Sequence, residues 1–321
     1  MSYIGIDIAK KSFEVAFPVE KGYQMKKYSY DAAGFAALLE HLPAASCCVL
    51  EATGPYYVRL ATFLYEQGID VAVVNPLVIK RFSQMRLLRT KTDQADAKLI
   101  AAYGALEKPA LWKPAATFIT ELQQESTVLE GLIKQRTALK NQLEAFNQLP
   151  HVSPQALQTL EKLLGTLQEQ IDMLEQSMAH KARQNTASTL DNLTSIPGIG
   201  PKTAIQLLII TQGFSRFSNA RQLCAYVGIC PRIYESGTSV KGKAKISKLG
   251  MGRLRALLYM CAWSACKHNQ ACKDLYERLL AKGKAKKLAL VAVANKLLKQ
   301  AFAVATKNLK FTENYAPLLV S

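Results

Sequence analysis

The stretch Tyr3-Ile4-Gly5-Ile6-Asp7-Ile8 places one carboxylate inside a short apolar run near the start of the chain. The run is followed by Lys10 and Lys11, a pattern typical of a buried strand that ends in a basic turn. A carboxylate in such a strand is costly unless it is paired or holds a cation. An aspartate that only bonds to backbone at a strand end is the simpler interpretation, so Asp7 must be considered together with the other acids of the chain.

The first part of the chain predicts strands and helices in an α/β order. Asp31 is expected to cap a helix whose residues Phe35, Leu38, Leu39 and Leu42 share one face. After the opening strand, further strands are predicted over residues 12–17, 23–30, 47–50 and 71–74, and helices over 31–42 and 56–67. The short spacing of the first three strands favours an antiparallel meander. Three strands, helix, strand, helix, strand is the element order of the ribonuclease-H-like fold.

Three further acids join Asp7 in this region. Glu51 ends the strand 47–50, and Asp93 and Asp96 begin a helix that is expected to run to about Tyr103. Because residues three apart share a helix face, Asp93 and Asp96 would point the same way. On their own they could be ordinary acids favoured by the helix dipole. With Asp7 and Glu51 they form a four-carboxylate set where this fold places its metal site.

The chemistry of this set predicts a divalent cation. Four convergent carboxylates repel one another unless a cation is present, and oxygen ligands without His or Cys favour Mg²⁺, or Mn²⁺ in its place. Two such ions about 4 Å apart can stabilise the attacking and leaving oxygens of a phosphodiester displacement. The seven cysteines form no CxxC pair, so zinc is not expected and the thiols are expected to be reduced.

The charge of the chain points to nucleic acid. Its 321 residues carry a formal net charge of +17, and 18 Lys plus Arg face 3 Asp plus Glu between Arg232 and Lys310. Such an excess favours a polyanionic partner. We expect no membrane partner, since no apolar run looks long enough to span a bilayer and no signal-peptide pattern opens the chain.

A helical connector is predicted after Pro109 and Pro114. Apolar residues recur at heptad spacing from Leu122 to Phe146 and again from Leu157 to Met178, which predicts a helical hairpin with a coiled-coil seam. Ser153 and Pro154 have the chemistry of a helix start. The seam could pack on itself or on another subunit, and we favour self-association.

The C-terminal region contains two segments of functional interest. Residues 193–204 resemble a helix–hairpin–helix element, in which Gly198 and Gly200 allow a tight turn and Lys202 adds charge for a phosphate. An ordinary packing unit is the alternative. After a short helix over residues 218–227, the polar, basic and glycine-rich residues 231–243 are expected to form a loop. Ser236 lies in this loop, and taken alone it is only a turn serine.

Five motifs in this order resemble the insertion sequence 110 (Piv-like, DEDD) transposases over almost the whole chain. They are Tyr-Ile-Gly-Ile-Asp-Ile-Ala-Lys from residue 3, Leu-Glu-Ala-Thr-Gly from 50, Lys-Thr-Asp-Gln-Ala-Asp-Ala from 91, Ile-Pro-Gly-Ile-Gly from 196 and Tyr-Glu-Ser-Gly-Thr-Ser from 234. The resemblance implies a RuvC-like catalytic domain (1–112), a coiled-coil hairpin (113–185) and a mainly helical transposase domain (186–321). It implies Asp7, Glu51, Asp93 and Asp96 as metal ligands and Ser236 as the nucleophile.

The same resemblance implies the partners of the protein. These are donor and target double-stranded DNA, a bridge RNA that pairs with both, and further copies of the chain, as a dimer that assembles to a tetramer. It also implies a cytoplasmic, nucleoid-associated protein of a prokaryote. The residues expected to contact nucleic acid are Gly198, Gly200, Lys202, Arg232, Lys241, Lys243, Lys245, Lys248, Arg253 and Arg255.

Three other functions compete with this one. A hydrolytic nuclease of the same fold, such as a junction resolvase, would use water as the nucleophile. A non-catalytic nucleic-acid-binding protein would use the acids only as caps and charge partners. An actin-like phosphotransferase would share the opening strand, but it would need further glycine-rich phosphate loops, which the sequence lacks.

Overall fold

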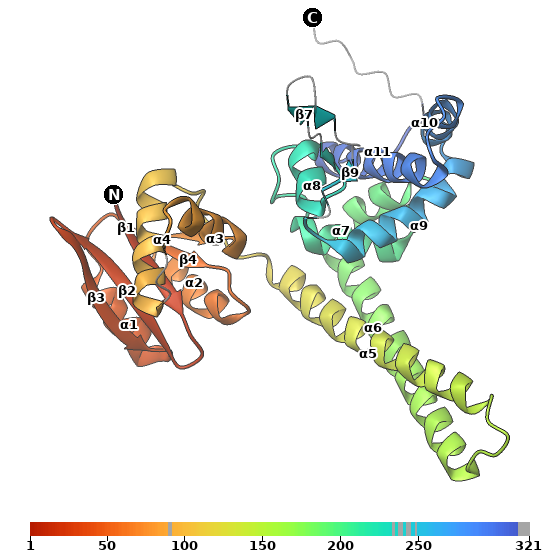
Figure 1. Ribbon diagram of the computed structural model, residues 1–321, viewed down its shortest axis with the longest axis horizontal. Coiled ribbons are helices and arrows are strands. Elements are labelled where there is room, and N and C mark those ends of the chain that lie inside the picture. The colour runs from red at the N-terminus through yellow and green to blue at the C-terminus, as the bar shows by residue number, and fades with distance from the viewer. Residues whose placement is uncertain (89–91, 233–234, 237–239, 242–244, 248, 314–321) are drawn as a thin grey trace, which may run out of the picture. The chain divides into compact units, whose positions relative to one another are not determined.

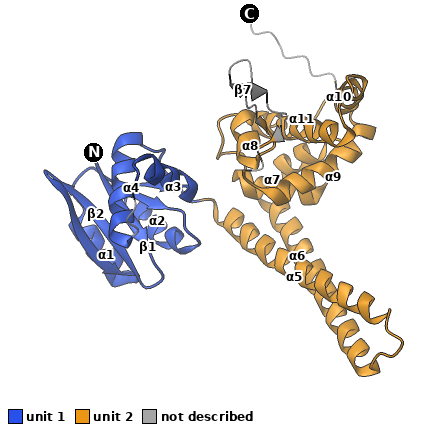
Figure 2. Ribbon diagram, viewed as in Figure 1, with its two compact units in different colours: residues 1–114 blue, residues 115–321 orange. Residues whose placement is uncertain are grey.

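A computed structural model describes residues 1–88, 92–232, 235–236, 240–241, 245–247 and 249–313, with the side chains of residues 232–245 left out. The chain forms two compact units, Met1–Pro114 and Ala115–Ser321 (Figure 2). The first is an α/β unit and the second is mainly helical, as the sequence predicts. The finer boundary between a hairpin domain and a transposase domain stays a prediction.

The first unit is built on a five-stranded mixed sheet (Figure 1). The strands β1, β2 and β3 form the predicted antiparallel meander, whereas β4 and β5 run parallel to β1. The spatial order is β3-β2-β1-β4-β5, so β1 lies in the middle of the sheet. The strands span Ser2–Ile8 (β1), Ser12–Val19 (β2), Gly22–Ser29 (β3), Ser46–Glu51 (β4) and Asp70–Val74 (β5).

Four helices cover the two faces of this sheet. Helices α1 (Ala32–His41) and α2 (Tyr56–Glu66) pack on the face that carries Ile4 and Ile6. Helices α3 (Pro76–Met85) and α4 (Asp93–Glu107) cover the opposite face, on which Tyr3 packs. Asp31 caps α1 as predicted, because its carboxylate accepts a hydrogen bond of 2.8 Å from the backbone N–H of Gly34.

Helix α3 is absent from the sequence-based prediction, which places only a loop at Asn75-Pro76. In the structure Asn75 is the N-cap residue, and its side chain accepts a hydrogen bond of 2.8 Å from the backbone N–H of Leu77. Pro76 occupies the first helical position, where its missing N–H costs nothing. The capping signature was therefore present in the sequence.

The second unit begins with the predicted helical hairpin, formed by α5 (Thr117–Phe146) and α6 (Pro154–Thr194). Its seam is buried near the helical body, at Leu122, Leu129, Ile171 and Met178, and is half-buried at most of its outer positions. Helix α6 begins where predicted, with Ser153 at its N-cap and Pro154 in its first turn, although the Ser153 side chain makes no capping hydrogen bond.

The hairpin shares one hydrophobic core with the helices that follow it, which explains why they form one unit. These are α7 (Pro201–Thr211), α8 (Ala220–Val227), α9 (Gly252–His268), α10 (Gln270–Ala281) and α11 (Lys286–Lys307). Helix α11 is long and apolar enough to cross a bilayer by length and composition, which corrects the expectation that no such run exists. Its residues Leu290, Val293, Leu297 and Leu298 are instead buried in the core of this unit.

The segment between α8 and α9 contains short paired strands where the sequence predicts a loop. Strand β6 (Pro231–Arg232) pairs with β9 (Lys245–Ile246), and β7 (Glu235–Ser236) pairs with β8 (Val240–Lys241). Both pairs are antiparallel and only two residues long. The segment therefore folds back on itself, with Ser236 opposite Val240.

Candidate active site

A glycine allows α4 to lie directly on the central strand of the first unit. A side chain at Gly5 would overlap the backbone of Ala97 and Ala101, two residues of α4 that face β1. Such close backbone approach is a recognised role of glycine inside a strand. Because side chains alternate along a strand, Asp7 lies on the same face as Gly5 and one step nearer the N-terminal end of α4.

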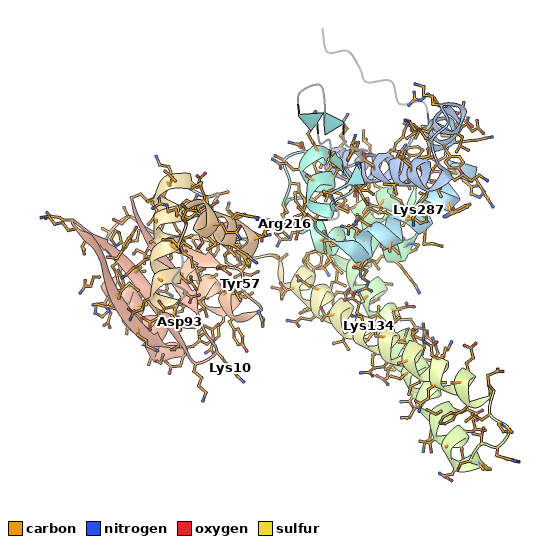
Figure 3. The ribbon with its side chains drawn as sticks, in the orientation of Figure 1. Lys10, Tyr57, Asp93, Lys134, Arg216 and Lys287 are labelled. Carbon is orange, nitrogen blue, oxygen red and sulfur yellow. The ribbon has the colours of Figure 1, made fainter. Side chains whose placement is uncertain are left out.

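Four carboxylates meet at this end of the sheet, on three elements. Asp7 lies near the end of β1, Glu51 is the last residue of β4, and Asp93 and Asp96 lie in the first turn of α4. Figure 3 labels Asp93, at the first residue of α4, and Lys10, just beyond the end of β1. Asp93 is exposed and the other three acids are half-buried. The predicted set is thus brought together by the fold.

The charges of these acids act on one another. Burial, followed by the negative charges of Asp96, Asp93 and Glu51, raises the pKa of Asp7 to about 6. A carboxylate surrounded by like charges favours its protonated form unless a cation balances the site. Burial and the three neighbouring acids therefore both favour the protonated form of Asp7.

The donor set fits a hard divalent cation, because it consists of carboxylate oxygens alone. Within the part of the chain that the structure describes, no three His, Cys, Asp or Glu side chains form a ready-made metal-binding group. Ligation would therefore require these partly exposed side chains to turn toward a common point. Glu51 already has a partner nearby, since Thr53 Oγ1 donates a hydrogen bond of 2.7 Å to its Oε1.

A fifth acid lies beside the set and was missed from the sequence. Glu14 on β2 stands directly opposite Asp7 in the antiparallel register and is only 7 % exposed. The strand prediction for residues 12–17 could have revealed it, because an acid interrupts an otherwise apolar run there. Its facing partner, however, depends on the strand register, which the sequence did not specify.

The predicted nucleophile lies in the second unit. Ser236 belongs to β7, and only its backbone and those of Arg232, Lys241 and Lys245 are described. The predicted nucleic-acid contacts Lys243 and Lys248 fall outside the described residues. The position of each of these side chains therefore stays a prediction.

The two ends of the segment that carries Ser236 are held together by backbone packing. Gly228 and Gly250 both have positive φ, at 77° and 116°. A side chain on Gly228 would overlap the carbonyl oxygen of Leu249, and one on Gly250 would overlap that of Tyr226. The backbone N–H of Ser247 also donates a hydrogen bond of 3.2 Å to the carbonyl oxygen of Cys230. The segment thus leaves and re-enters the helical body at one narrow neck.

The helix–hairpin–helix candidate lies between α6 and α7. Gly198 packs against Ala265 of α9, and Gly200 is exposed at the N-cap of α7 with open space around it. The structure therefore places Gly198 at a helix-packing contact, while Gly200 remains accessible to a ligand. Only Gly198 has a structural reason to be glycine, because its φ is 106° and a side chain there would overlap Ala265.

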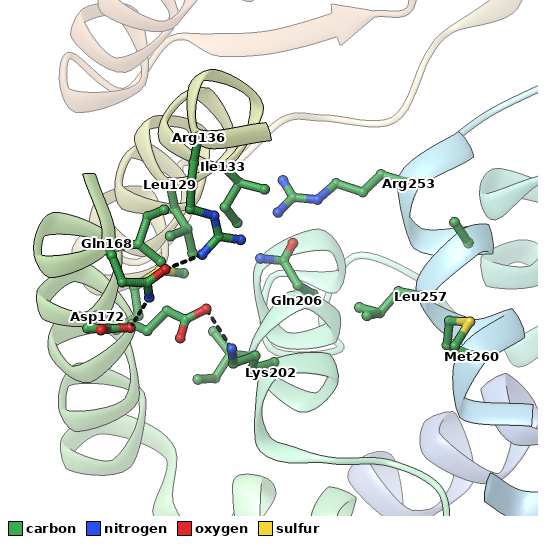
Figure 4. A pocket seen from close by; sticks show the side chains of 15 residues that line it. Leu129, Ile133, Arg136, Gln168, Asp172, Lys202, Gln206, Arg253, Leu257 and Met260 are labelled. Atoms are coloured by element: carbon green, nitrogen blue, oxygen red, sulfur yellow. Dashed lines mark hydrogen bonds and ion pairs between the residues drawn. The ribbon is translucent and has the colours of Figure 1, made fainter. Parts of the chain in front are cut away.

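Three of the predicted basic contacts have partners within the protein. The Nζ atom of Lys202 lies 2.6 Å from Glu175 Oε1, Arg253 forms an ion pair with Glu130, and Arg255 donates a hydrogen bond of 2.8 Å to the carbonyl oxygen of Val227. Lys202 and Arg253 also line a cavity of about 560 Å³ between the hairpin and helices α7 and α9 (Figure 4). A phosphate that binds Lys202 or Arg253 would therefore have to compete with the glutamate that is already paired with that side chain.

Comparison with known proteins now adds to this geometry. Residues 4–154 match the DEDD transposase model of the IS110 type, and residues 190–277 match the model described as transposase IS116/IS110/IS902 family. The chain is 32 % identical to the pilin gene-inverting protein of Moraxella lacunata, over 97 % of either chain. The chain belongs to the IS110/IS116/IS902 transposase family.

Other relatives of this transposase are more distant but still span most of it. It is 26 % identical to the transposase for insertion sequence element IS1328 of Yersinia enterocolitica, over 82 % of this chain and 83 % of the relative. It is 25 % identical to the transposase for insertion sequence element IS1111A of Coxiella burnetii, over 91 % and 86 %. The first matched region contains all four carboxylates, and the second contains Ser236.

The raised pKa of Asp7 predicts how this transposase responds to pH when no divalent cation is present. The pKa of Asp7 is about 6 in the folded protein and 3.8 without these interactions, as in the unfolded chain. Ionisation of Asp7 therefore destabilises the folded state increasingly from about pH 4 to pH 6, and the full cost applies above that range. Asp7→Asn removes this charge. In a chelator at pH 7.5 we expect it to raise the melting temperature by roughly 3 °C, after allowance for solvent screening, with less gain at pH 5.

Thermal unfolding of both proteins at the two pH values provides the measurement. An equal or lower melting temperature for Asp7→Asn at pH 7.5 would contradict the raised pKa of Asp7, which burial and the three neighbouring acids cause together. A gain of the same size at pH 5 and pH 7.5 would also contradict the prediction, because the effect must follow the ionisation of the wild-type carboxyl.

Proposed function

We propose that this transposase cleaves and rejoins DNA by phosphodiester transfer through a covalent serine–DNA intermediate, guided by a structured RNA. The observation that carries the proposal is the meeting of Asp7, Glu51, Asp93 and Asp96 at one end of the sheet. A relative named for inverting a pilin gene aligns with 97 % of the chain, and two relatives named as transposases align with 82 % and 91 % of it. Moving or inverting DNA requires strands to be cut and joined to new partners.

The four carboxylates are proposed to hold Mg²⁺, or Mn²⁺ in its place. When bound there, the cation supplies positive charge that polarises a DNA phosphate and lowers the cost of charge on the attacking and leaving oxygens. Asp7 and Glu51 come from neighbouring strands, and the two helical acids come from a different element. Their oxygens would thus reach a common point from several directions.

Ser236 is proposed to be the nucleophile. Its Oγ atom would form a bond to the phosphorus of the scissile phosphate, while the bond from that phosphorus to the departing deoxyribose oxygen breaks. A serine hydroxyl is a weak nucleophile and needs activation, which the carboxylate site could provide. The ester keeps the energy of the broken linkage, so attack by a new strand end can reseal DNA without ATP.

The residue positions set one requirement on this mechanism. Ser236 belongs to the second unit, and the four carboxylates belong to the first. Both units, from one subunit or from two, must therefore engage the same DNA phosphate during the reaction. A dimer that assembles to a tetramer is part of the proposal and would supply several copies of each part.

The excess charge of the C-terminal region supports a nucleic-acid partner. Between Arg232 and Lys310, 18 basic residues outnumber 3 acidic ones. Lysines 282, 284, 286 and 287 lie on or beside the turn from α10 to α11 and are exposed, with no ion pair to a described residue. Such lysines can bind phosphates of DNA or RNA with little competition from acids of the chain. Family resemblance is the support for an RNA guide.

Removal of each proposed component tests this function. Protein purified with its bound RNA is incubated with labelled donor and target DNA, and exchanged strands are measured by electrophoresis. We expect exchange with Mg²⁺ or Mn²⁺, loss with a chelator and recovery when the cation is restored. Ribonuclease treatment should also abolish exchange, and the copurified RNA should restore it. Undiminished exchange after chelation would contradict the metal site, and undiminished exchange after ribonuclease treatment would contradict guidance by RNA.

A further inference from the structure

The sheet of the first unit carries a ladder of three charged residues beside the four carboxylates. Asp7 on β1 pairs in register with Glu14 on β2, and Glu14 pairs with Lys27 on β3. Residues directly opposite each other on neighbouring strands point to the same face, with Cβ atoms about 5 Å apart. The order across the sheet is therefore carboxylate, carboxylate and ammonium.

The packing of α4 shows which face this is. Gly5 pairs with Ala16, and both lie beneath Ala97 and Ala101 of α4. Glu14 is two residues from Ala16, so it lies on the face covered by α4, at the end of the sheet where the four carboxylates meet. Its burial is consistent with that position, since only 7 % of the residue is exposed.

Glu14 and Lys27 differ in their exposure to solvent. Lys27 Nζ lies 3.5 Å from Glu14 Oε1, and the lysine side chain is 62 % exposed. A buried carboxylate directly opposite another carboxylate destabilises the sheet, and a mainly exposed lysine offsets little of that cost. A divalent cation bound by the four carboxylates weakens this repulsion, because its positive charge offsets part of their negative charge and itself attracts Glu14.

We propose that Glu14 is a positioning residue for the cation-binding carboxylates, and that Lys27 is its internal counter-ion, which competes with the divalent cation for the same negative charge. The inference rests on the proposed metal site and adds two residues to it. Glu14 supplies negative charge beside Asp7 without belonging to the four predicted ligands. Lys27 holds Glu14 in place when the cation is absent.

This arrangement predicts opposite effects for the two members of one ion pair. Glu14→Gln removes negative charge beside the cation and should weaken Mn²⁺ binding about tenfold, the size typical of a residue that supports metal ligands. Lys27→Gln removes a competing positive charge and should strengthen Mn²⁺ binding, by roughly threefold because the lysine is exposed and screened. A purely structural ion pair could not produce changes of opposite sign.

The neighbouring lysine provides a matched control. Lys26 is next to Lys27 on β3, but it pairs with Val15, and its ammonium lies over the ring of Phe17. It therefore faces the other side of the sheet. Lys26→Gln makes the same change in charge at almost the same place in the chain, and we expect it to leave Mn²⁺ affinity unchanged.

The experiment is a calorimetric titration of full-length protein with Mn²⁺ at pH 7.5, for wild type, Glu14→Gln, Lys27→Gln, Lys26→Gln and Asp7→Asn. Thermal unfolding in chelator shows whether each variant is folded. The inference would be overturned if Lys27→Gln bound Mn²⁺ with the same affinity as wild type. It would also be overturned if Lys26→Gln strengthened Mn²⁺ binding as much as Lys27→Gln does. Because Lys27 and Lys26 are surface side chains, this arm decides the matter even when Glu14→Gln folds poorly.

Failure of the metal site itself would look different. In that case wild type would bind no Mn²⁺, or Asp7→Asn would bind it as tightly as wild type, and both the site and the inference would fall. Binding that is lost in Asp7→Asn but equal in wild type, Glu14→Gln and Lys27→Gln would leave the metal site standing. It would reduce Glu14 and Lys27 to a structural ion pair.

Discussion

Replacement of Ser236 by alanine is expected to lower DNA strand cleavage by at least about 1000-fold and to remove any protein–DNA adduct. The physical reason is that alanine has no oxygen to attack phosphorus, and loss of a nucleophile leaves only the residual effect of binding. The measurement is denaturing electrophoresis of end-labelled DNA with bound RNA and Mg²⁺. Wild type should give a slowly migrating labelled band that protease digestion removes, and Ser236→Ala should give none.

Ser239→Ala is the matched control, since it removes a hydroxyl from the same short segment. We expect it to cleave DNA and to form the adduct as wild type does. If Ser236→Ala cleaves normally and wild type forms no adduct, water must be the nucleophile. A hydrolytic enzyme of the junction-resolvase kind would then replace the recombinase, while the assignment of the carboxylates would survive.

The second large effect concerns the carboxylates. Asp7→Asn and Asp96→Asn are each expected to lower cleavage by at least about 1000-fold, because an amide supplies no negative charge for the cation that the reaction needs. Both changes preserve the size of the side chain, so the fold and the affinity for RNA should remain close to those of wild type. Cleavage rates in Mg²⁺ and RNA binding by filter retention provide the two measurements.

Glu107→Gln serves as the control for these variants. Glu107 ends α4, whereas Asp96 lies in its first turn, so the same loss of charge at the far end of the helix should leave cleavage intact. Retention of cleavage by Asp7→Asn or Asp96→Asn would refute the metal-site assignment. Loss of RNA binding together with cleavage would instead indicate that the substitution disturbs the fold.

Much of the first unit could be predicted because its signals are local. Short apolar runs predict the strands. Asp31 predicts the start of α1, because its side chain accepts a hydrogen bond from the backbone N–H of Gly34, three residues away. Helix α3 was missed although Asn75 and Pro76 carry an equally local capping signal. Only Asn75 separates the end of β5 from the start of α3, so the predicted loop is in fact the N-cap of a helix.

The site was predictable in composition and not in detail. The order of Asp7, Glu51, Asp93 and Asp96 along the chain indicated a shared site, but their closeness depends on Gly5, which lets α4 approach β1. Hydrophobic periodicity does not predict contacts between residues that are far apart in the sequence. Glu14 meets Asp7 only through strand register, and Lys202 meets Glu175 only because α7 packs on the hairpin.

The neck formed by Gly228 and Gly250 has a consequence for how this protein can change. Backbone packing outside the Ser236 segment holds its two ends together, so the segment itself need not encode its own closure. Each doubling of loop length then adds only about 0.6 kcal/mol of closure entropy. Residues 231–247 consequently form a cassette, which insertions can lengthen or a graft from a relative can replace while the helical body keeps its fold. The residues around Ser236 can therefore change in sequence and length as one module, while the serine itself is retained.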